Sequence, residues 1–217
     1  MPIEIRRAIM AELNSLKDMS RFQHRRRIAV AIVIGLILVA LLTIRSAWSS
    51  DRVHEYIEDF GIGVIVMTIL GRMWCTLYIG GRKSSEIVRL GPYSMSRNPL
   101  YVFSTIGAFG IGMMTGSLTV SFALAVICYI AFQFVITAEE GYLEKVFGET
   151  YTNYKREVPR FFPKLSLYKE TEVLTVKSSM LYRTFTDGLV FFVSYPLLEF
   201  VEYLQGQHIL PVLLRLY

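Results

Sequence analysis

The sequence predicts an all-α, polytopic integral membrane protein with four transmembrane helices, a fifth as the alternative, a helical hairpin and cytoplasmic C-terminal helices. Of the 217 residues, 53% are hydrophobic and 19% are charged, and the mean hydropathy is +0.42. This composition is too apolar for an ordinary soluble domain. Several apolar runs reach the ~20 residues that cross a bilayer. The net charge of +5 is concentrated next to these runs, which favours an anionic membrane surface over nucleic acid as the partner.

Four regions follow from this pattern. Residues 1–27 form a basic cytoplasmic segment, and residues 28–59 hold the first transmembrane helix and an external loop. Residues 60–163 form the membrane core, and residues 164–217 form a tail with an interfacial or membrane helix.

The four spans are predicted from apolar runs of about the length that crosses a bilayer. Ile28–Ile44 is the first span, and Phe60–Ile79 is the second, with Arg72 inside it. Leu100–Leu118 and Thr119–Thr137 are the third and fourth. Because only a few small residues separate the last two, they are expected to form an antiparallel helical hairpin.

The tail is predicted to be helical in two places. Glu139–Glu157 has a helix-like pattern that ends before Pro159, where the proline ring stops a helix. Gly188–Leu204 is apolar but contains Glu199 and Glu202, which are costly at the bilayer centre. An interfacial or re-entrant helix is the first interpretation of this segment, and a fifth span is the alternative.

Orientation is predicted from the basic residues in short loops. Arg25, Arg26 and Arg27 abut the first span, whereas acidic residues dilute the arginines of the next loop. The positive-inside rule therefore places the N-terminus in the cytoplasm. The segments 80–99 and 139–160 return to the same side, so the polar site is predicted at the cytoplasmic face of a multi-pass protein, in a bacterial inner membrane.

The hairpin is expected to bring distant polar residues together. Arg97 and Tyr101 stand at its start, and Glu139 and Glu140 stand at its end, at a similar depth if both limbs rise about 1.5 Å per residue. Two adjacent carboxylates against a negative lipid surface require a cationic partner or ligand. The alternative for Arg97 and for Arg72 is an interfacial anchor whose guanidinium reaches the headgroups.

Cysteine and histidine give no sign of a metal centre or disulfide framework. Cys75 and Cys128 lie in apolar runs, and His24, His54 and His208 are scattered. Without a metal-ligand spacing among them, no metal is predicted.

Three motifs, at a characteristic separation, carry a family resemblance. They are GPY (91–93) with RNPLY (97–101), EEGYL (139–143) after the hairpin, and FGETYTNYKREVPRFFP (147–163). Together they resemble the isoprenylcysteine carboxyl methyltransferase and phospholipid N-methyltransferase family of membrane enzymes. The resemblance covers roughly residues 60–163, where Arg72 and Trp74 are also similar to the family's preceding helix.

The resemblance implies an S-adenosylmethionine-dependent methyltransferase that acts at the cytoplasmic face. Its acceptor would be lipophilic: a prenyl-type carboxylate, a lipid amine or a small hydrophobic molecule. Membrane lipids and this substrate are the implied partners, and the implied catalytic residues are Arg97, Glu139 and Glu140. The implied cofactor-binding residues are Gly91, Tyr93, Arg97, Asn98, Pro99, Tyr101 and Glu140. The residues implied to contact substrate or close the site are Arg72, Tyr151, Tyr154 and Arg160.

Two hypotheses concern individual side chains of this set. Arg97 is expected to anchor the cofactor carboxylate or an anionic substrate, and Glu140 is expected to contact the cofactor. Many members carry histidine where Asn98 stands. An amide can replace an imidazole that only forms hydrogen bonds, but it cannot replace one that moves a proton.

Two other functions are compatible with the sequence. One is a nicotinamide-dependent membrane reductase of isoprenoid or sterol-like double bonds, whose C-terminal pattern is similar. The other is a non-enzymatic membrane partner protein in which the hairpin is structural.

Overall fold

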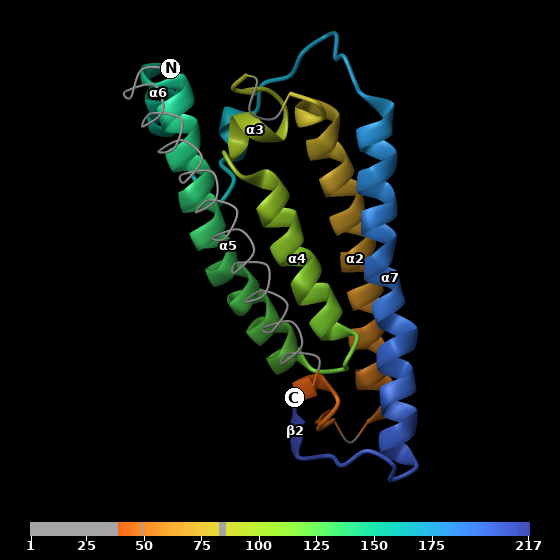
Figure 1. Ribbon diagram of the computed structural model, residues 1–217. Coiled ribbons are helices and arrows are strands. Elements are labelled where there is room, and N and C mark those ends of the chain that lie inside the picture. The colour runs from red at the N-terminus through yellow and green to blue at the C-terminus, as the bar shows by residue number, and fades with distance from the viewer. Residues whose placement is uncertain (1–38, 49, 83–85) are drawn as a thin grey trace, which may run out of the picture.

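The structure is a computed structural model that describes residues 39–48, 50–82 and 86–217. Four long or apolar helices form an elongated bundle, with small elements at either end (Figure 1). The bundle helices are α2 (Asp51–Ile79), α4 (Pro99–Met113), α5 (Leu118–Phe147) and α7 (Ser178–Gly206). The end elements are α3 (Pro92–Met95), α6 (Glu149–Glu157) and η1 (Leu165–Leu167) at one end, and β1 (Ile44–Ser46) and β2 (Leu214–Leu216) at the other.

Within the described residues, three helices are long and apolar enough to cross a membrane. They are α2 from Arg52, α5 and α7, with 28, 30 and 29 residues. Helix α4 is apolar but has only 15 residues, because it ends at Met113, before the predicted end of the third span at Leu118, and the chain then turns. Residues 28–38 of the predicted first span, Ile28–Ile44, lie outside the described part of the chain.

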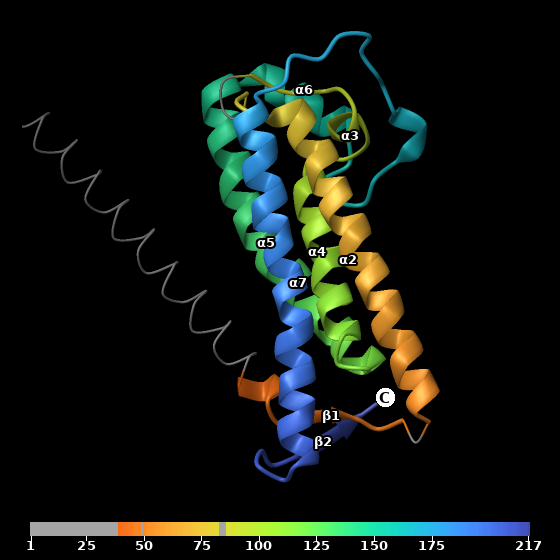
Figure 2. The same ribbon diagram turned by 90° about the vertical axis from the view of Figure 1, so that its right-hand side faces the viewer.

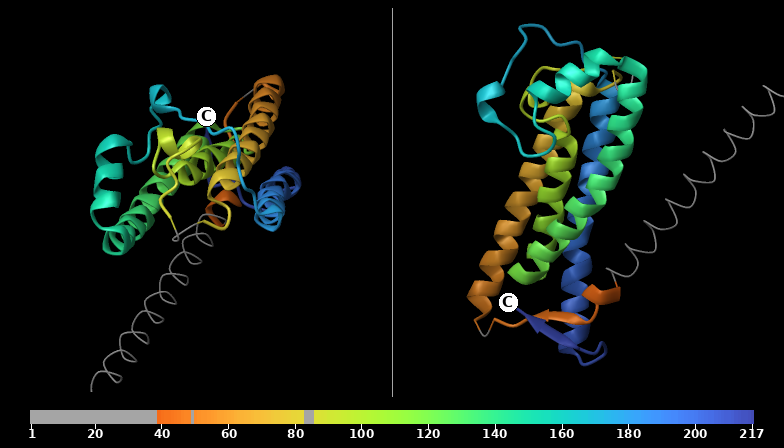
Figure 3. Two further views of the ribbon diagram at one scale, coloured as in Figure 1. Left: turned by 90° about the horizontal axis from the view of Figure 1, so that it is seen from above. Right: turned by 90° about the vertical axis from the view of Figure 1, so that its left-hand side faces the viewer.

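Helix α4 lies at the centre of the bundle. It packs against α2 on one side and α5 on the other, while α7 packs along α2 (Figure 2). Seen along the bundle, α5 and α7 lie at opposite edges (Figure 3). Small residues permit the central contact: a Cβ on Gly61 would lie 3.1 Å from the Gly110 carbonyl oxygen. Close backbone approach at glycines is the usual means of packing helices in lipid.

The outer face of α5 carries a stripe of exposed apolar side chains. Phe122, Val126, Ile130 and Phe134 follow one another at intervals of four residues and are each at least half exposed. This periodicity places them on one helical face. An exposed apolar face on a helix of this length is expected to contact lipid acyl chains.

Several predicted boundaries are corrected by the structure. Helix α2 begins at Asp51 rather than Phe60, so half of the predicted loop is helical. Helix α5 runs through to Phe147, and the break comes at Gly148, whose φ is +54°. The predicted helix Glu139–Glu157 is therefore two helices, and the second ends before Pro159 as predicted.

The tail also differs from its first interpretation. Helix α7 extends from Ser178 to Gly206 and runs the length of α2, which favours the membrane-spanning alternative over an interfacial helix. Two short strands further correct the all-α prediction, because β1 and β2 pair in parallel with Arg45 opposite Arg215. The Tyr217 carbonyl, just past β2, accepts hydrogen bonds from Thr119 N (2.6 Å) and Ser117 Oγ (2.9 Å) at the start of α5.

Candidate active site

A cavity of about 610 Å³ lies at the end of the bundle where α3 and α6 are found. This volume is typical of small-molecule and cofactor sites. Helices α2, α4 and α5 form its deeper walls, and α3, α6 and the segment 86–88 form the rest. Nine of the predicted site residues line it: Arg72, Tyr93, Arg97, Asn98, Tyr101, Glu139, Glu140, Tyr151 and Tyr154.

A buried ion pair joins the two ends of the hairpin. Arg97 Nε donates to Glu140 Oε1 at 2.9 Å, and Arg97 Nη2 donates to Glu140 Oε2 at 3.4 Å. Both side chains are 8% exposed. The predicted meeting of residues 97–101 with residues 139–140 is confirmed.

The Arg97 guanidinium makes further hydrogen bonds to the backbone. Its Nη1 donates to the carbonyls of Lys155 and Val158, both at 2.8 Å, at the C-terminal end of α6. Because guanidinium has five N–H groups, these contacts and the ion pair occupy most of its donors. Arg97 therefore fixes α6 to the hairpin, and the expected direct contact with a cofactor carboxylate is not what its geometry favours.

Glu140 is surrounded by donors in the same way. Asn98 Nδ2 donates to its Oε1 at 3.2 Å, and Arg160 Nε is 3.5 Å from its Oε2. Asn98 Nδ2 also donates to the Arg160 carbonyl at 3.0 Å. At residue 98, where the resembling family often has histidine, the structure thus shows a bridging hydrogen-bond donor, which an amide can supply.

The backbone around Arg97 is held in place by the motif that ends the resemblance. Arg97 N donates to the Pro159 carbonyl at 2.9 Å, and Ser96 Oγ donates to the Phe161 carbonyl at 2.9 Å. Lys164 N donates to the Met95 carbonyl at 3.0 Å. The segments 95–98 and 158–164 therefore lie side by side, although the sequence separates them by about sixty positions.

Helix α6 closes one side of the cavity with two buried tyrosines. Tyr154 Oη donates to the Tyr93 carbonyl at 2.7 Å. Burial, as the largest cause, raises the pKa of Tyr93, Tyr151 and Tyr154 above the ordinary tyrosine value. All three phenols therefore stay protonated near neutral pH and can act as hydrogen-bond donors.

Two buried polar atoms on the cavity wall lack a hydrogen-bond partner within the described residues. They are Tyr93 Oη and Arg72 Nε. Tyr93 is 5% exposed, and Arg72 Nη1 donates to Ser104 Oγ. Since buried polar groups are almost always paired, two unpaired donors in residues that line the cavity mark positions where a bound ligand could accept hydrogen bonds.

The remaining predicted residues take different positions. Glu139 is half-buried on the wall, and the Tyr101 ring lies 4.7 Å from the Phe132 ring, centroid to centroid. Arg160 is not among the lining residues, and it reaches the site through Glu140 and through its carbonyl, which accepts from Asn98. Gly91 and Pro99 are not among the lining residues, so the predicted cofactor contact of these two is not supported. Gly91 packs against the Tyr78 ring, and Pro99 begins α4.

Other lining residues were missed from the sequence. Ser104 on α4 and Phe132 on α5 line the cavity, as do Tyr142 and Leu143 beside the EE pair. Helical spacing gives a usable signal for two of them. Ser104 stands seven residues after Arg97 and Phe132 eight before Glu140, about two turns in each case. The segment 86–88 carries no such signal, because it is not helical.

Comparison with known proteins gives one family model and several relatives. The model for phospholipid methyltransferase matches residues 30–150. The nickel-cobalt-cadmium resistance protein NccN of Alcaligenes xylosoxydans xylosoxydans is 36% identical over 192 residues, 88% of each chain. The cobalt-zinc-cadmium resistance protein CzcN of Cupriavidus metallidurans is 37% identical over 176 residues, 81% of each chain.

A more distant relative is named as an enzyme. The protein-S-isoprenylcysteine O-methyltransferase of Schizosaccharomyces pombe is 33% identical over 81 residues, which cover 37% of this chain and 34% of the yeast protein. No solved structure matches the chain.

Proposed function

Because the chain belongs to the phospholipid methyltransferase family, we propose that it is an S-adenosylmethionine-dependent enzyme that methylates a lipophilic acceptor at the cytoplasmic face of the membrane. The cavity carries this proposal. It is built largely by the motifs of the family resemblance, and its wall combines charged residues near α6 with apolar side chains, Arg72 and Ser104 between the helices. Such a wall suits a charged cofactor and an apolar acceptor together.

The residues present fit the chemistry of the cofactor. Its cationic part would lie near the Glu139 carboxylate and the faces of Tyr101 and Tyr151, which attract cations. Its oxygen and nitrogen acceptors would take hydrogen bonds from donors such as Tyr93 Oη. Three hydrogen-bond donors and the Arg160 guanidinium already surround Glu140, so we assign the cofactor contact to Glu139, whose side chain also lines the cavity.

The proposed mechanism uses this chain mainly for positioning. The chemistry that the cofactor supplies is a methyl group on a sulfonium, which an acceptor atom takes by in-line displacement. Arg97 and Glu140 hold the two ends of the hairpin at fixed separation, and Tyr151 and Tyr154 limit access of water from the α6 side. An amine acceptor would give its proton to a carboxylate such as Glu139, whereas a carboxylate acceptor needs no base.

The first experiment tests the cofactor. Purified full-length protein in lipid nanodiscs would be titrated with S-adenosylmethionine and, separately, with NADPH by calorimetry. We expect saturable 1:1 binding of the former alone. Binding of NADPH alone would favour the reductase, and binding of neither would favour a non-enzymatic partner protein.

The second experiment identifies the acceptor class. Methyl-labelled S-adenosylmethionine would be supplied with phosphatidylethanolamine, a prenylcysteine analogue, or a total membrane extract. Label in one extractable lipid species would define the acceptor, and Glu139→Gln should abolish the transfer. If no arm is labelled above the level of Glu139→Gln, the proposed activity is wrong.

The names of the two relatives that match over most of their length suggest where the activity is used. We propose that this methyl transfer supports growth in the presence of nickel, cobalt, zinc or cadmium ions. Cells that lack the protein should then be more sensitive to these ions than complemented cells. Complementation with Glu139→Gln should fail if methyl transfer is the contribution, and should succeed if the protein acts without it.

A further inference from the structure

We propose that His54, Glu58 and Glu202 form a binding site for a divalent transition metal ion of the zinc type, far from the methyl-transfer cavity. His54 and Glu58 lie near the start of α2, and Glu202 lies near the end of α7. Both helix ends are at the β1–β2 end of the bundle (Figure 1). This inference goes beyond the proposed function and does not depend on it.

The three donor atoms have the separations that a small metal ion requires. His54 Nε2 is 3.1 Å from Glu58 Oε1 and 3.2 Å from Glu202 Oε2, and all three donor atoms lie within 4.8 Å of one another. Ligands about 2.0–2.1 Å from a tetrahedral ion are about 3.3 Å apart. An ion could therefore bind with small movements of these side chains, leaving a fourth position for water.

The hydrogen bonds of this cluster are incomplete without a cation. The same nitrogen, His54 Nε2, faces an oxygen from each carboxylate. An imidazole nitrogen carries at most one proton, so it cannot donate a full hydrogen bond to both oxygens. Glu58 is 8% exposed, and burying a carboxylate that lacks a full hydrogen bond is energetically unfavourable. A metal ion would engage all three atoms at once.

Packing holds the imidazole in this orientation. Gly116, in the turn between α4 and α5 with φ +64°, lies directly behind the ring. A Cβ at this position would be 1.9 Å from His54 Nδ1, so only glycine leaves room for the ring. Ser46 Oγ donates to the Gly116 carbonyl at 3.1 Å and fixes the turn to β1. This close packing limits the orientations that the imidazole can adopt.

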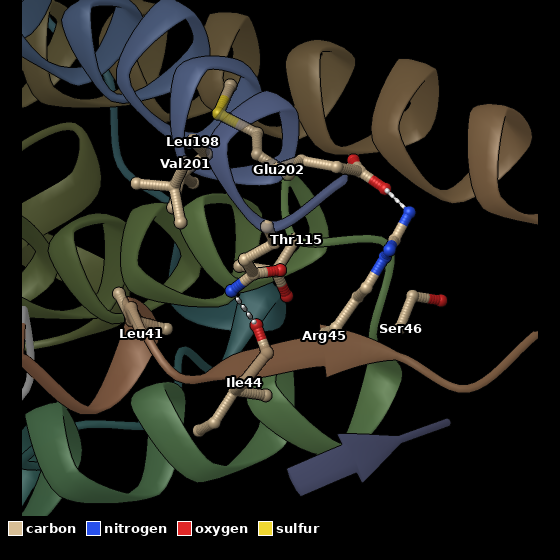
Figure 4. A pocket seen from close by; sticks show the side chains of 10 residues that line it. Leu41, Ile44, Arg45, Ser46, Thr115, Leu198, Val201 and Glu202 are labelled. Atoms are coloured by element: carbon tan, nitrogen blue, oxygen red, sulfur yellow. Dashed lines mark hydrogen bonds and ion pairs between the residues drawn. The ribbon is translucent and has the colours of Figure 1, made fainter. Parts of the chain in front are cut away.

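One competing cation lies next to the cluster. Arg45 Nη2 is 3.6 Å from Glu202 Oε1, and both residues line a small pocket together with Thr115 (Figure 4). Both side chains are about one third exposed, so this ion pair is expected to be weak and displaceable. As metal ligands, two ionised carboxylates and a neutral imidazole would supply a charge of −2, which matches a divalent ion once Arg45 moves aside.

The ligand set selects a class of metal. Magnesium and calcium prefer all-oxygen sites, whereas an imidazole nitrogen favours zinc, cobalt or nickel. With one nitrogen and two carboxylates, Zn²⁺ and Co²⁺ are the ions expected to fit.

The test measures metal binding by the untagged full-length protein in nanodiscs. Zn²⁺ affinity would be read by competition with a chromophoric chelator, and Co²⁺ by its visible absorption. We expect one ion per chain. His54→Ala and Glu58→Gln should weaken binding by more than the roughly 10- to 100-fold that loss of a supporting contact causes. Glu55→Gln, an exposed carboxylate one position from His54, is the matched control and should bind normally.

Two further variants keep the result interpretable. Glu202→Gln sits at a partly exposed position and should fold normally, as checked by thermal unfolding without metal, yet lose Zn²⁺ binding. Arg45→Gln removes the competing cation and should raise the affinity. If the wild type binds no stoichiometric ion, or if His54→Ala binds equally well, the cluster is a hydrogen-bonded ion cluster only. The cavity lies at the other end of the bundle. Binding of S-adenosylmethionine to His54→Ala is therefore measured separately, so that loss of metal binding and loss of cofactor binding can be distinguished.

Discussion

Single residues in the cavity divide into those that hold it together and those that face a ligand. The Glu140 carboxylate accepts hydrogen bonds from Arg97 and Asn98 and forms an ion pair with Arg160, so its negative charge is compensated within the protein. Tyr93 Oη and Arg72 Nε, by contrast, are buried without a hydrogen-bond partner within the described residues, and both residues line the cavity. Substitutions at the two kinds of position should therefore separate stability from binding.

Glu140→Gln should destabilise the protein. The change leaves the buried Arg97 guanidinium, 8% exposed, without its counterion, and breaking a buried pair typically costs about 3 kcal/mol or more. The free energy of unfolding in mixed micelles measures this. Glu144→Gln is the matched control: Glu144 pairs with Lys155 at 2.7 Å but is 40% exposed, so the loss should stay under about 1 kcal/mol. Equal losses in both variants would contradict the structural role of Glu140.

Tyr93→Phe should weaken ligand binding without lowering stability. The buried hydroxyl has no partner within the described residues, so removing it costs no hydrogen bond in the ligand-free protein. If a ligand accepts from it, affinity for the cofactor or the acceptor should fall about 5- to 10-fold. Calorimetry and steady-state kinetics would show which of the two is affected.

Tyr154→Phe provides the comparison for that variant. Its hydroxyl donates to the Tyr93 carbonyl at 2.7 Å, so stability should fall by about 1 kcal/mol. Unchanged affinities for both ligands in Tyr93→Phe would show that the hydroxyl faces no ligand.

At the scale of elements, the break between α5 and α6 determines where α6 lies, and α6 closes one side of the cavity. Gly148 adopts φ +54° and ψ −126°, a conformation that is strained for any residue with a Cβ. A Cβ there would contact nothing within 4 Å, so the effect of alanine is purely conformational. Gly148→Ala should cost about 1–3 kcal/mol and increase hydrogen exchange in α6.

The same helix offers a control of opposite sign. Gly141 lies inside α5, and a Cβ there would also contact nothing within 4 Å. Gly141→Ala should therefore stabilise the helix by about 0.5–1 kcal/mol. If both variants change stability in the same direction, helix α5 does not end where the structure places the break.

Contacts between elements that are adjacent in the sequence, and motifs with a characteristic spacing, could be predicted. Contacts between segments far apart in the sequence often could not. The hairpin follows from two apolar runs and a short turn, and it correctly brought Arg97 to Glu140. The family resemblance drawn from the RNPLY, EEGYL and VPR motifs is confirmed by the phospholipid methyltransferase model. The pairing of residues 95–98 with 158–164 depends on backbone hydrogen bonds that leave no periodicity in the sequence.

Polar residues in the tail explain why the sequence favours an interfacial helix there, whereas the length and packing of α7 favour a span. Glu199 and Glu202 made a membrane helix look costly, and only the fold shows His54 and Arg45 next to Glu202. The 148 positions between His54 and Glu202 likewise concealed the proposed metal ligands. Strands of three residues, such as β1 and β2, are too short for an alternating pattern to stand out.

At the scale of the whole molecule, the strand pairing constrains the path of the chain across the membrane. Lys169 lies next to α3 at the cavity end, since its carbonyl accepts from Gly91 N at 2.7 Å. Leu214 lies beside Ile44 at the opposite end. Helix α7 connects the two ends, and its 29 residues rise about 43 Å at ~1.5 Å each, more than the ~30 Å hydrocarbon core.

This path predicts that residues 170 and 217 lie on opposite sides of the membrane. Green fluorescent protein inserted after Glu170 should fluoresce, because the cavity end is proposed to be cytoplasmic, where this reporter folds. Alkaline phosphatase fused after Tyr217 should be active, because that reporter requires export. The two fusions with exchanged reporters serve as controls and should be silent. If both positions report the same side, α7 does not cross the bilayer, and the β1–β2 end cannot lie across the membrane from the cavity.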